Sequence, residues 1–397
     1  MTPIPRRKGR VPAPPQLRKG RTHPRYRFFA ATAGGLEPVL LAELQALGLE
    51  ELAQDAGGVF FSGEMEACYR ANLWLRTASR VLRIVARVPC SDETTLYRET
   101  YRIDWQQFMD VSQTLAVRVR LGQTGFTHGQ FLALKIKDAI VDRFRDTFQR
   151  RPSVDKERPD LNIQAYIHLG QCTLALDSSG PPLFMRGYRR GEAKAPLKET
   201  LAAGLIALTG WQGDRPFYDP FCGSGTLPIE AALLAGRRAP GLLRERFGFE
   251  AWPDFHAPAF RAEQAQARER ARPVPVPIVA SDRHPKAVAV ARDNARRAGV
   301  GDAVTFAVRD IADFEAAAGP GLILTNPPYG ERLGDAARLA PLYKTLGDTL
   351  KHKAKGMEAY IFTQHGPLIK SIGLRPSKRT ILRNGPLDCR LLRFEMY

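Results

Sequence analysis

The chain has 397 residues, 44% of them hydrophobic, so it is long enough for two or three domains with sizeable cores. Its formal net charge is +18 and its pI is about 10.0, which indicates a polyanionic partner, most simply a nucleic acid; a basic membrane-surface protein is the alternative. Because no apolar stretch approaches the length of a transmembrane helix and the start lacks the apolar core of a signal peptide, we expect a cytoplasmic protein with no membrane partner.

The cysteines are few and dispersed, and none forms a Cys-x-x-Cys pair. An odd, scattered set argues for reduced thiols and against a disulfide framework or a zinc site. The seven histidines do not cluster in a metal-ligand pattern either, so we expect no metal. The five cysteines are Cys68, Cys90, Cys172, Cys222 and Cys389.

Residues 1–25 hold eight basic residues, no acidic residue and several interspersed prolines. Such a segment cannot bury a core, so we expect it to be disordered. It is either an electrostatic arm for RNA or a solvated tail with no specific role.

The first half of the chain reads as short mixed elements, typical of an α+β fold. We expect a domain boundary near residue 190, where the pattern of elements changes. The predicted strands are 26–32, 59–62, 81–88 and 115–119, the predicted helices are 37–47, 66–79 and 129–145, and 162–168 with 172–177 are a predicted hairpin.

From residue 216 the order becomes strand, glycine-rich turn, helix, and then strand and helix again, which predicts a doubly wound, mostly parallel sheet. The end differs, because Asn384-Gly385 is a strong turn signal between two strand-like segments, 379–383 and 387–394. We therefore expect an α/β domain finished by an antiparallel hairpin. Its predicted parallel strands are 217–219, 278–281, 304–308, 322–325 and 359–363.

The most informative motif is Asn326-Pro327-Pro328-Tyr329, directly after the apolar run 321–325. A strand that ends here places the motif at the carboxyl edge of the sheet, where open α/β folds bind ligands. The amide oxygen of Asn326 and the carbonyl of Pro327 accept hydrogen bonds, the prolines stiffen the loop, and Tyr329 offers a face for stacking. The pattern favours a planar base with an exocyclic amine; the alternative is a Pro-rich turn after a buried strand.

A second motif, Asp219-Pro220-Phe221-Cys222-Gly223-Ser224-Gly225-Thr226, precedes an apolar helix at 227–234. Glycines at a strand-to-helix turn let a ligand approach the backbone closely. The motif lacks the lysine of a phosphate-binding P-loop and does not match Gly-x-Gly-x-x-Gly. The alternative is a tight turn without a ligand.

Two acidic residues follow the next two predicted strands. Asp282 is placed to accept hydrogen bonds from both ribose hydroxyls of a nucleoside cofactor, and Asp310 from an adenine amine. Either residue alone is more often a helix N-cap, but two in succession, followed by the Asn-Pro-Pro-Tyr motif, favour a nucleoside site.

The order of these four motifs resembles the amino-methylating class I methyltransferases that use S-adenosylmethionine (SAM). The segments 185–189 (MRGYR) and 195–202 (APLKETLA) look like the linker of THUMP-domain RNA methyltransferases, and the insertion with 239–242 (APGL) and 247–252 (FGFEAW) looks like that family's insertion. The resemblance covers nearly all of residues 26–397 and is more specific from 185 to 395. The nearest branches are the bacterial large-subunit (23S) rRNA guanine-N2 methyltransferases and the tRNA acceptor-stem guanine-N2 enzymes.

The resemblance implies a role for each motif. Asn326, Pro327, Pro328 and Tyr329 would form the catalytic loop, and Asn326 would also border the cofactor. The methionine end of SAM would be held by the glycine turn, the ribose by Asp282, and the adenine by Asp310 with Ile311. The implied cofactor-binding residues are Asp219, Phe221, Gly223, Gly225, Thr226, Asp282, Arg283, Asp310 and Ile311.

The resemblance also implies a division into domains and an RNA partner. The expected parts are a disordered basic tail at 1–25, a small ferredoxin-like domain at 26–68, a THUMP RNA-binding domain at 69–178, a linker at 179–195 and a methyltransferase domain at 196–397. We expect rRNA as the substrate, with tRNA as the alternative. A DNA amino-methyltransferase and an RNA-binding factor without catalysis are more distant alternatives.

Overall fold

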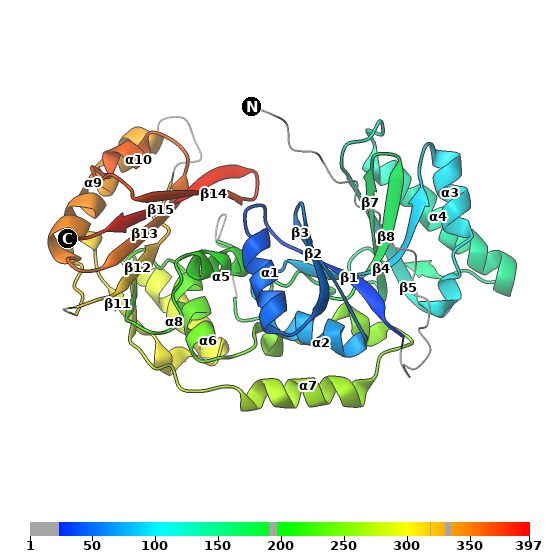
Figure 1. Cartoon of the computed structure of the whole chain (residues 1–397), viewed down its shortest axis with the longest axis horizontal. Helices are drawn as coiled ribbons and strands as arrows, with labels where there is room; N and C mark the ends of the chain where they lie inside the picture. The colour runs from blue at the N-terminus through cyan, green and yellow to red at the C-terminus, as the bar shows by residue number, and fades with distance from the viewer. Residues whose placement is uncertain (1–23, 190–196, 318, 330–334) are drawn as a thin grey trace.

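The computed structural model describes residues 24–189, 197–317, 319–329 and 335–397 (Figure 1). Nearly all of the predicted tail at 1–25 and the last part of the predicted linker lie outside these residues. The described chain forms two sheets, one in each half, and each carries its own layer of helices.

The first half is one mixed sheet of eight strands in the order β2-β3-β1-β4-β8-β7-β5-β6. The predicted hairpin is confirmed, because β7 and β8 pair antiparallel. The elements are β1 (Tyr26–Ala31), α1 (Glu37–Ala46), β2 (Glu50–Asp55), β3 (Gly58–Gly63), α2 (Met65–Trp74), β4 (Arg80–Pro89), α3 (Glu93–Tyr101), β5 (Thr114–Leu121), α4 (Gly129–Phe148), β6 (Ser153–Val154), β7 (Leu161–His168) and β8 (Gln171–Asp177).

Strands β2 and β6 were not predicted, and two helices of this half also differ from the sequence expectation. The helix predicted at 66–79 ends at Trp74, because Leu75 is extended and the next backbone amides, of Arg76 and Thr77, donate to the Glu43 carboxylate. The helix α3 escaped prediction although Asp92 caps it, accepting from the Thr95 amide at 2.7 Å.

The second half is a seven-stranded sheet in the order β11-β10-β9-β12-β13-β15-β14. The first five strands are parallel, and β15 pairs antiparallel with both β13 and β14, so the predicted doubly wound sheet with a terminal hairpin is confirmed. The elements are α5 (Glu199–Leu208), β9 (Phe217–Asp219), α6 (Thr226–Ala235), α7 (Ala257–Glu269), β10 (Ile278–Asp282), α8 (Pro285–Arg297), β11 (Thr305–Val308), β12 (Leu322–Thr325), α9 (Asp335–Lys353), β13 (Glu358–Gln364), α10 (Leu368–Ser371), β14 (Lys378–Asn384) and β15 (Leu387–Glu395).

The strand order reverses between β9 and β12. The chain moves outward on one side from β9 to β10 and β11, and on the other from β12 to β13. In an open α/β sheet this switch point, at the carboxyl ends of the strands, is where a ligand binds. The fold therefore brings the ends of β9 and β12 together at the place where the sequence predicted a site.

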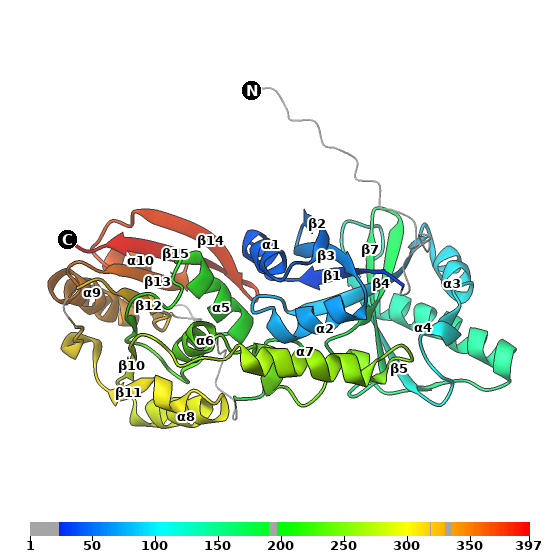
Figure 2. The same ribbon diagram turned by 60° about the horizontal axis from the view of Figure 1, so that its bottom comes forward.

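The insertion between α6 and β10 packs on the first half of the chain. Its helix α7 lies along α2 (Figure 2), and the Tyr69 ring of α2 makes tilted and edge-on contacts, at centroid distances of 4.9–6.0 Å, with three insertion rings, Phe249, Phe255 and Phe260. Buried aromatic pairs of this kind stabilise a contact beyond the area that they bury. The insertion thus joins the two halves.

Candidate active site

The carboxyl ends of β9, β10, β11 and β12 border a pocket of about 470 Å³, a size typical of small-molecule sites. Most of the residues predicted for the cofactor and the target base contribute to its wall. The lining residues are Pro220, Phe221, Gly223, Asp282, Arg283, His284, Arg309, Asp310, Ile311, Asn326, Pro328, Arg338, Leu339 and Leu342.

The turn after β9 needs its glycines for two different reasons. Both Gly223 (φ 52°) and Gly225 (φ 85°) adopt the left-handed conformation that side chains disfavour. A Cβ on Gly225 would meet Ala291 of α8 at 3.0 Å, whereas the space beside Gly223 is open. Gly225 therefore allows close helix packing, and Gly223 leaves the backbone accessible from the pocket.

Asp282, the last residue of β10, is half-buried and braces the glycine turn. Its Oδ2 accepts a hydrogen bond from the Gly223 amide at 3.1 Å, and its Oδ1 accepts from the His284 amide at 2.9 Å. Because each carboxylate oxygen has two lone pairs, both oxygens can still accept from a ligand in the pocket.

Asp310 caps the short 3₁₀ helix Ile311–Asp313, with its Oδ1 accepting from the Ala312 amide at 3.1 Å. The N-cap alternative therefore describes part of its role in the fold. The residue also lines the pocket, and the side chain of Ile311 is 3% exposed beneath it. The arrangement gives a carboxylate beside an apolar floor, which suits the edge and face of a purine.

Asn326 follows β12 and carries an unusual buried acceptor. Its side-chain oxygen is shielded from solvent and has no hydrogen-bond partner among the described residues. An unsatisfied buried acceptor costs about 1–3 kcal/mol, so its persistence in a pocket wall indicates an absent donor. Pro328 also lines the pocket, and Pro327 is buried behind it.

Tyr329 lies beside the pocket rather than in its wall. Its hydroxyl accepts a hydrogen bond from the side-chain amide (Nδ2) of Asn384 at 2.8 Å, which connects the loop to the terminal hairpin. Its ring is partly buried against the core between α9 and the sheet. The stacking role predicted for Tyr329 remains a proposal.

Asp219 is 2% exposed and does not line the pocket. Its Oδ1 accepts from the Thr325 hydroxyl at 2.7 Å and from the Phe221 amide at 3.1 Å, so it links the glycine turn to the residue before Asn326. Burial raises the pKa of this carboxyl to about 7. Its predicted contact with the cofactor therefore stays a proposal, whereas its link between the two loops is a feature of the structure.

Sequence reasoning missed several residues around the site. Arg189 of the linker donates a hydrogen bond to the Thr226 hydroxyl at 2.7 Å, and the cofactor contact predicted for Thr226 stays a proposal. On α8, Asn294 donates to the Ser224 carbonyl at 3.0 Å and supports the turn from behind. One pocket wall comes from α9, whose leucine spacing was a signal that could have predicted an amphipathic helix; its lining residues are Arg338, Leu339 and Leu342.

Comparison with known proteins shows the family to which the chain belongs. Residues 186–393 match the model of the RMKL-like methyltransferase domain. The chain belongs to this family. The preceding residues match the RlmL ferredoxin-like domain at 27–82 and the THUMP domain at 90–177.

Two relatives and one solved structure illustrate the similarity. Over 93% of the chain, it is 43% identical to a ribosomal RNA large subunit methyltransferase K/L of Syntrophotalea carbinolica and 40% identical to a Synechocystis protein, slr0064, named as an RNA methyltransferase. The chain spans 53% of the first relative and 97% of the second. The methyltransferase SMU.472, solved with S-adenosylhomocysteine, is 32% identical with a TM-score of 0.85, covering 94% of this chain and 98% of that one.

Methyltransferases of this fold take their methyl group from SAM, and the pocket fits that cofactor. Carboxylates stand at the ends of two neighbouring strands, the backbone is open beside Gly223, and Asn326 presents an unpartnered oxygen. The thiol of Cys222 is no candidate nucleophile, because burial raises its pKa.

The described residues contain no group of three metal-ligating side chains. Among the same residues, no helix has the length and apolar character to span a membrane. All five cysteines lie in the described part, buried and unpaired.

Proposed function

We propose that this chain transfers a methyl group from SAM to the exocyclic N2 amine of a guanine in structured RNA, with 23S rRNA as the substrate. The observation that carries the proposal is the buried, unpartnered oxygen of Asn326 in the pocket wall. The names of the relatives, the THUMP match and the net charge of +18 support RNA as the acceptor.

In this mechanism Asn326 and the Pro327 carbonyl each accept one hydrogen from the target amine. A guanine N2 amine is a poor nucleophile, because its lone pair is delocalised into the ring. Holding both hydrogens favours a more tetrahedral nitrogen whose lone pair is free, and most of the rate gain comes from this positioning. No strong base is required, because the nitrogen loses its proton easily once it is alkylated.

SAM supplies a methyl group already activated by a positive sulfur. Asp282 would hold the ribose hydroxyls, Asp310 and Ile311 the adenine, and the glycine turn the methionine end. Phe221, Arg283 and the more distant Asp219, Gly225 and Thr226 would complete the cofactor side. We propose these cofactor contacts because each residue lies in the pocket wall or in a loop or helix end next to it.

A guanine within a stem must leave the base stack to reach this pocket, at a cost of a few kcal/mol. Stacking on Tyr329 would offset part of that cost. We propose that residues 26–178 bind the RNA, as a small domain at 26–68 followed by THUMP at 69–178, that 179–195 link the halves, and that 196–397 transfer the methyl group. The three family models support the order of these parts, but the ferredoxin-like match extends to residue 82 and the THUMP match begins at residue 90, so they favour a later first boundary than 68.

The experiment is to incubate the purified chain with labelled SAM and, separately, unmodified rRNA, tRNA and duplex DNA, and to identify the methylated nucleoside by mass spectrometry. N2-methylguanosine in rRNA is the expected result. N2-methylguanosine in tRNA alone would make tRNA the substrate in place of rRNA. A methylated adenine or cytosine in DNA would overturn the proposal. Failure to bind SAM would favour an RNA-binding factor without catalysis.

A further inference from the structure

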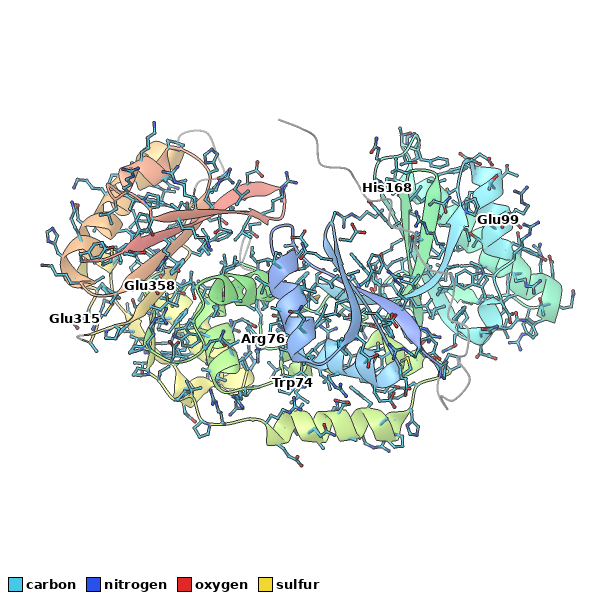
Figure 3. All side chains as sticks on the ribbon, viewed as in Figure 1. Trp74, Arg76, Glu99, His168, Glu315 and Glu358 are labelled. Carbon is cyan, nitrogen blue, oxygen red and sulfur yellow. The ribbon has the colours of Figure 1, made fainter. Side chains whose placement is uncertain are left out.

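The outer half of the first sheet has one face covered by helices and one face open. On β7 the residues alternate, so that Ile163 and Ile167 are fully buried with the core residues of α4, whereas Tyr166 is 44% exposed. The same alternation on β5 leaves Arg118 and Arg120 exposed. Figure 3 shows His168 on the side of this sheet away from Glu99 of α3.

The register aligns four open-face residues in a single row across four strands. Arg87 of β4 pairs with Thr173 of β8, Thr173 with Tyr166 of β7, and Tyr166 with Arg120 of β5. Directly paired residues point to the same face, so the row places an aromatic ring between two arginines, with the outer strands about 14 Å apart. We call Arg87, Arg118, Arg120, Tyr166 and His168 the open-face strip.

The two rings of the strip, Tyr166 and His168, are held in place by packing and a hydrogen bond. The rings of Tyr166 and His168 stack at 5.7 Å with an interplanar angle of 11°, and His168 Nδ1 accepts from the Gln123 amide at 3.0 Å. A Cβ on Gly122 would lie 2.4 Å from the Tyr166 hydroxyl, so a larger residue there would displace these rings. The fold therefore fixes two flat rings at the end of the strands.

The charge of the strip is positive and largely uncompensated. Within the part of the chain that the structure describes, Arg87 and Arg120 form no ion pair, and both are exposed. Among the open-face residues of these four strands the one carboxylate is Asp177, which is buried and paired with Arg80. Exposed arginines that flank a stacking surface suit phosphates on either side of an unstacked base.

A hollow lies at the same end of the sheet. A cavity of about 550 Å³ is bordered by the β7–β8 turn at Leu169 and Gly170 and by the loop after β5, including Gln123 and Phe126. It adjoins His168, so a chain that stacks on the strip can continue into it.

From these features we propose that the open-face strip binds a single-stranded segment of RNA, with one base stacked on Tyr166 and phosphates on Arg87 and Arg120. Side chains do not read the deep groove of duplex RNA, whereas an aromatic ring on an open sheet stacks an unpaired base. The inference rests on RNA being the substrate of the proposed reaction. If the inference holds, the RNA substrate must contain an unpaired segment that binds the first half of the chain, away from the methyltransferase pocket.

The test uses fluorescence anisotropy with the full chain, a labelled ten-nucleotide single-stranded RNA of mixed adenine and uracil, and a 16-base-pair RNA duplex. Tyr166→Ala should weaken binding of the single strand about tenfold, and Tyr166→Phe should restore it, because stacking needs the ring alone. Removing both arginines in Arg87→Ser/Arg120→Ser should flatten the slope of log affinity against log salt by about 1.4. The matched control, Arg145→Ser on the exposed side of α4, should change neither quantity.

Unchanged binding of the single strand by Tyr166→Ala would overturn the inference, and so would an equal loss for the duplex. Methyl transfer and SAM binding, measured on the same samples, separate this result from the proposed function. If methyl transfer persists but Tyr166→Ala binds the single strand as the parent chain does, the proposed role of the strip is wrong and the proposed function stands. If Tyr166→Ala weakens binding of the single strand but no RNA receives a methyl group, the proposed function is wrong and the role of the strip stands.

Discussion

The two sheets of this molecule carry their candidate sites in different ways. In the second half the site residues stand at the carboxyl ends of parallel strands, so each strand and its loop form one contiguous motif. In the first half the open-face strip takes one or two residues from each of three strands and assembles them by register. A site of the first kind can be read along the chain, whereas a site of the second kind needs the pairing of strands.

This difference explains what the sequence could predict. The bounds of β9 and β12 were predicted without error, because a buried parallel strand is a short apolar run that ends at a turn signal. The placement of Asp282, Asp310 and Asn326 around one pocket followed from their positions at the ends of the parallel strands β10, β11 and β12.

The features that escaped prediction depend on tertiary contacts. The docking of the insertion on Tyr69, the wall formed by α9 and the hydrogen bond from Arg189 to Thr226 all join residues far apart in the sequence. No local pattern encodes such contacts. Whether the predicted roles of the site residues hold is a matter for the experiments below.

The largest expected effect concerns the junction between the two regions. Glu230 of α6 lies 3.6 Å from Arg186, and both side chains are almost fully buried. Glu230→Gln removes the counter-charge that is ion-paired with the buried Arg186, so we expect unfolding in urea to show a loss of about 3 kcal/mol. The control Asp293→Asn breaks an exposed pair with Arg296 within α8 and should cost less than about 1 kcal/mol. Equal losses would show that the buried pair does not hold the halves together.

The next effect tests the motif-encoded site. Asn326→Ala should lower kcat by about 10²- to 10³-fold, because it removes an acceptor that acts on the reacting amine. SAM affinity, measured by calorimetry, should change little. Unchanged turnover would remove Asn326 from the mechanism, and a parallel loss of SAM binding would make its role structural.

A smaller effect is expected at the cofactor side of the same pocket. Asp282→Ala should weaken SAM binding by about 2 kcal/mol, since it removes a charged acceptor and the brace on the Gly223 amide. Asp302→Ala removes the same charge from an exposed position before β11 and serves as the control. If both variants bind SAM like the parent chain, the ribose assignment is wrong.

The pH dependence of stability probes the link between the two loops. Burial raises the pKa of Asp219 to about 7, so between pH 4 and 7 the folded chain keeps a proton that the unfolded chain has released. This group's contribution to stability is therefore full below pH 4 and falls as the pH rises toward 7. Asp219→Asn cannot ionise, and its stability relative to the parent should rise by about 1 kcal/mol per pH unit in that window. A difference that is flat with pH would contradict the raised pKa.

The central claim is that the pocket holds the N2 amine of a guanine. Once the methylated nucleotide is located, an RNA with inosine at that position removes this amine and leaves the rest of the base unchanged. We predict that the inosine RNA binds with the same affinity and receives no methyl group from labelled SAM. Methyl transfer at the inosine would show that another atom is the acceptor and would contradict the account.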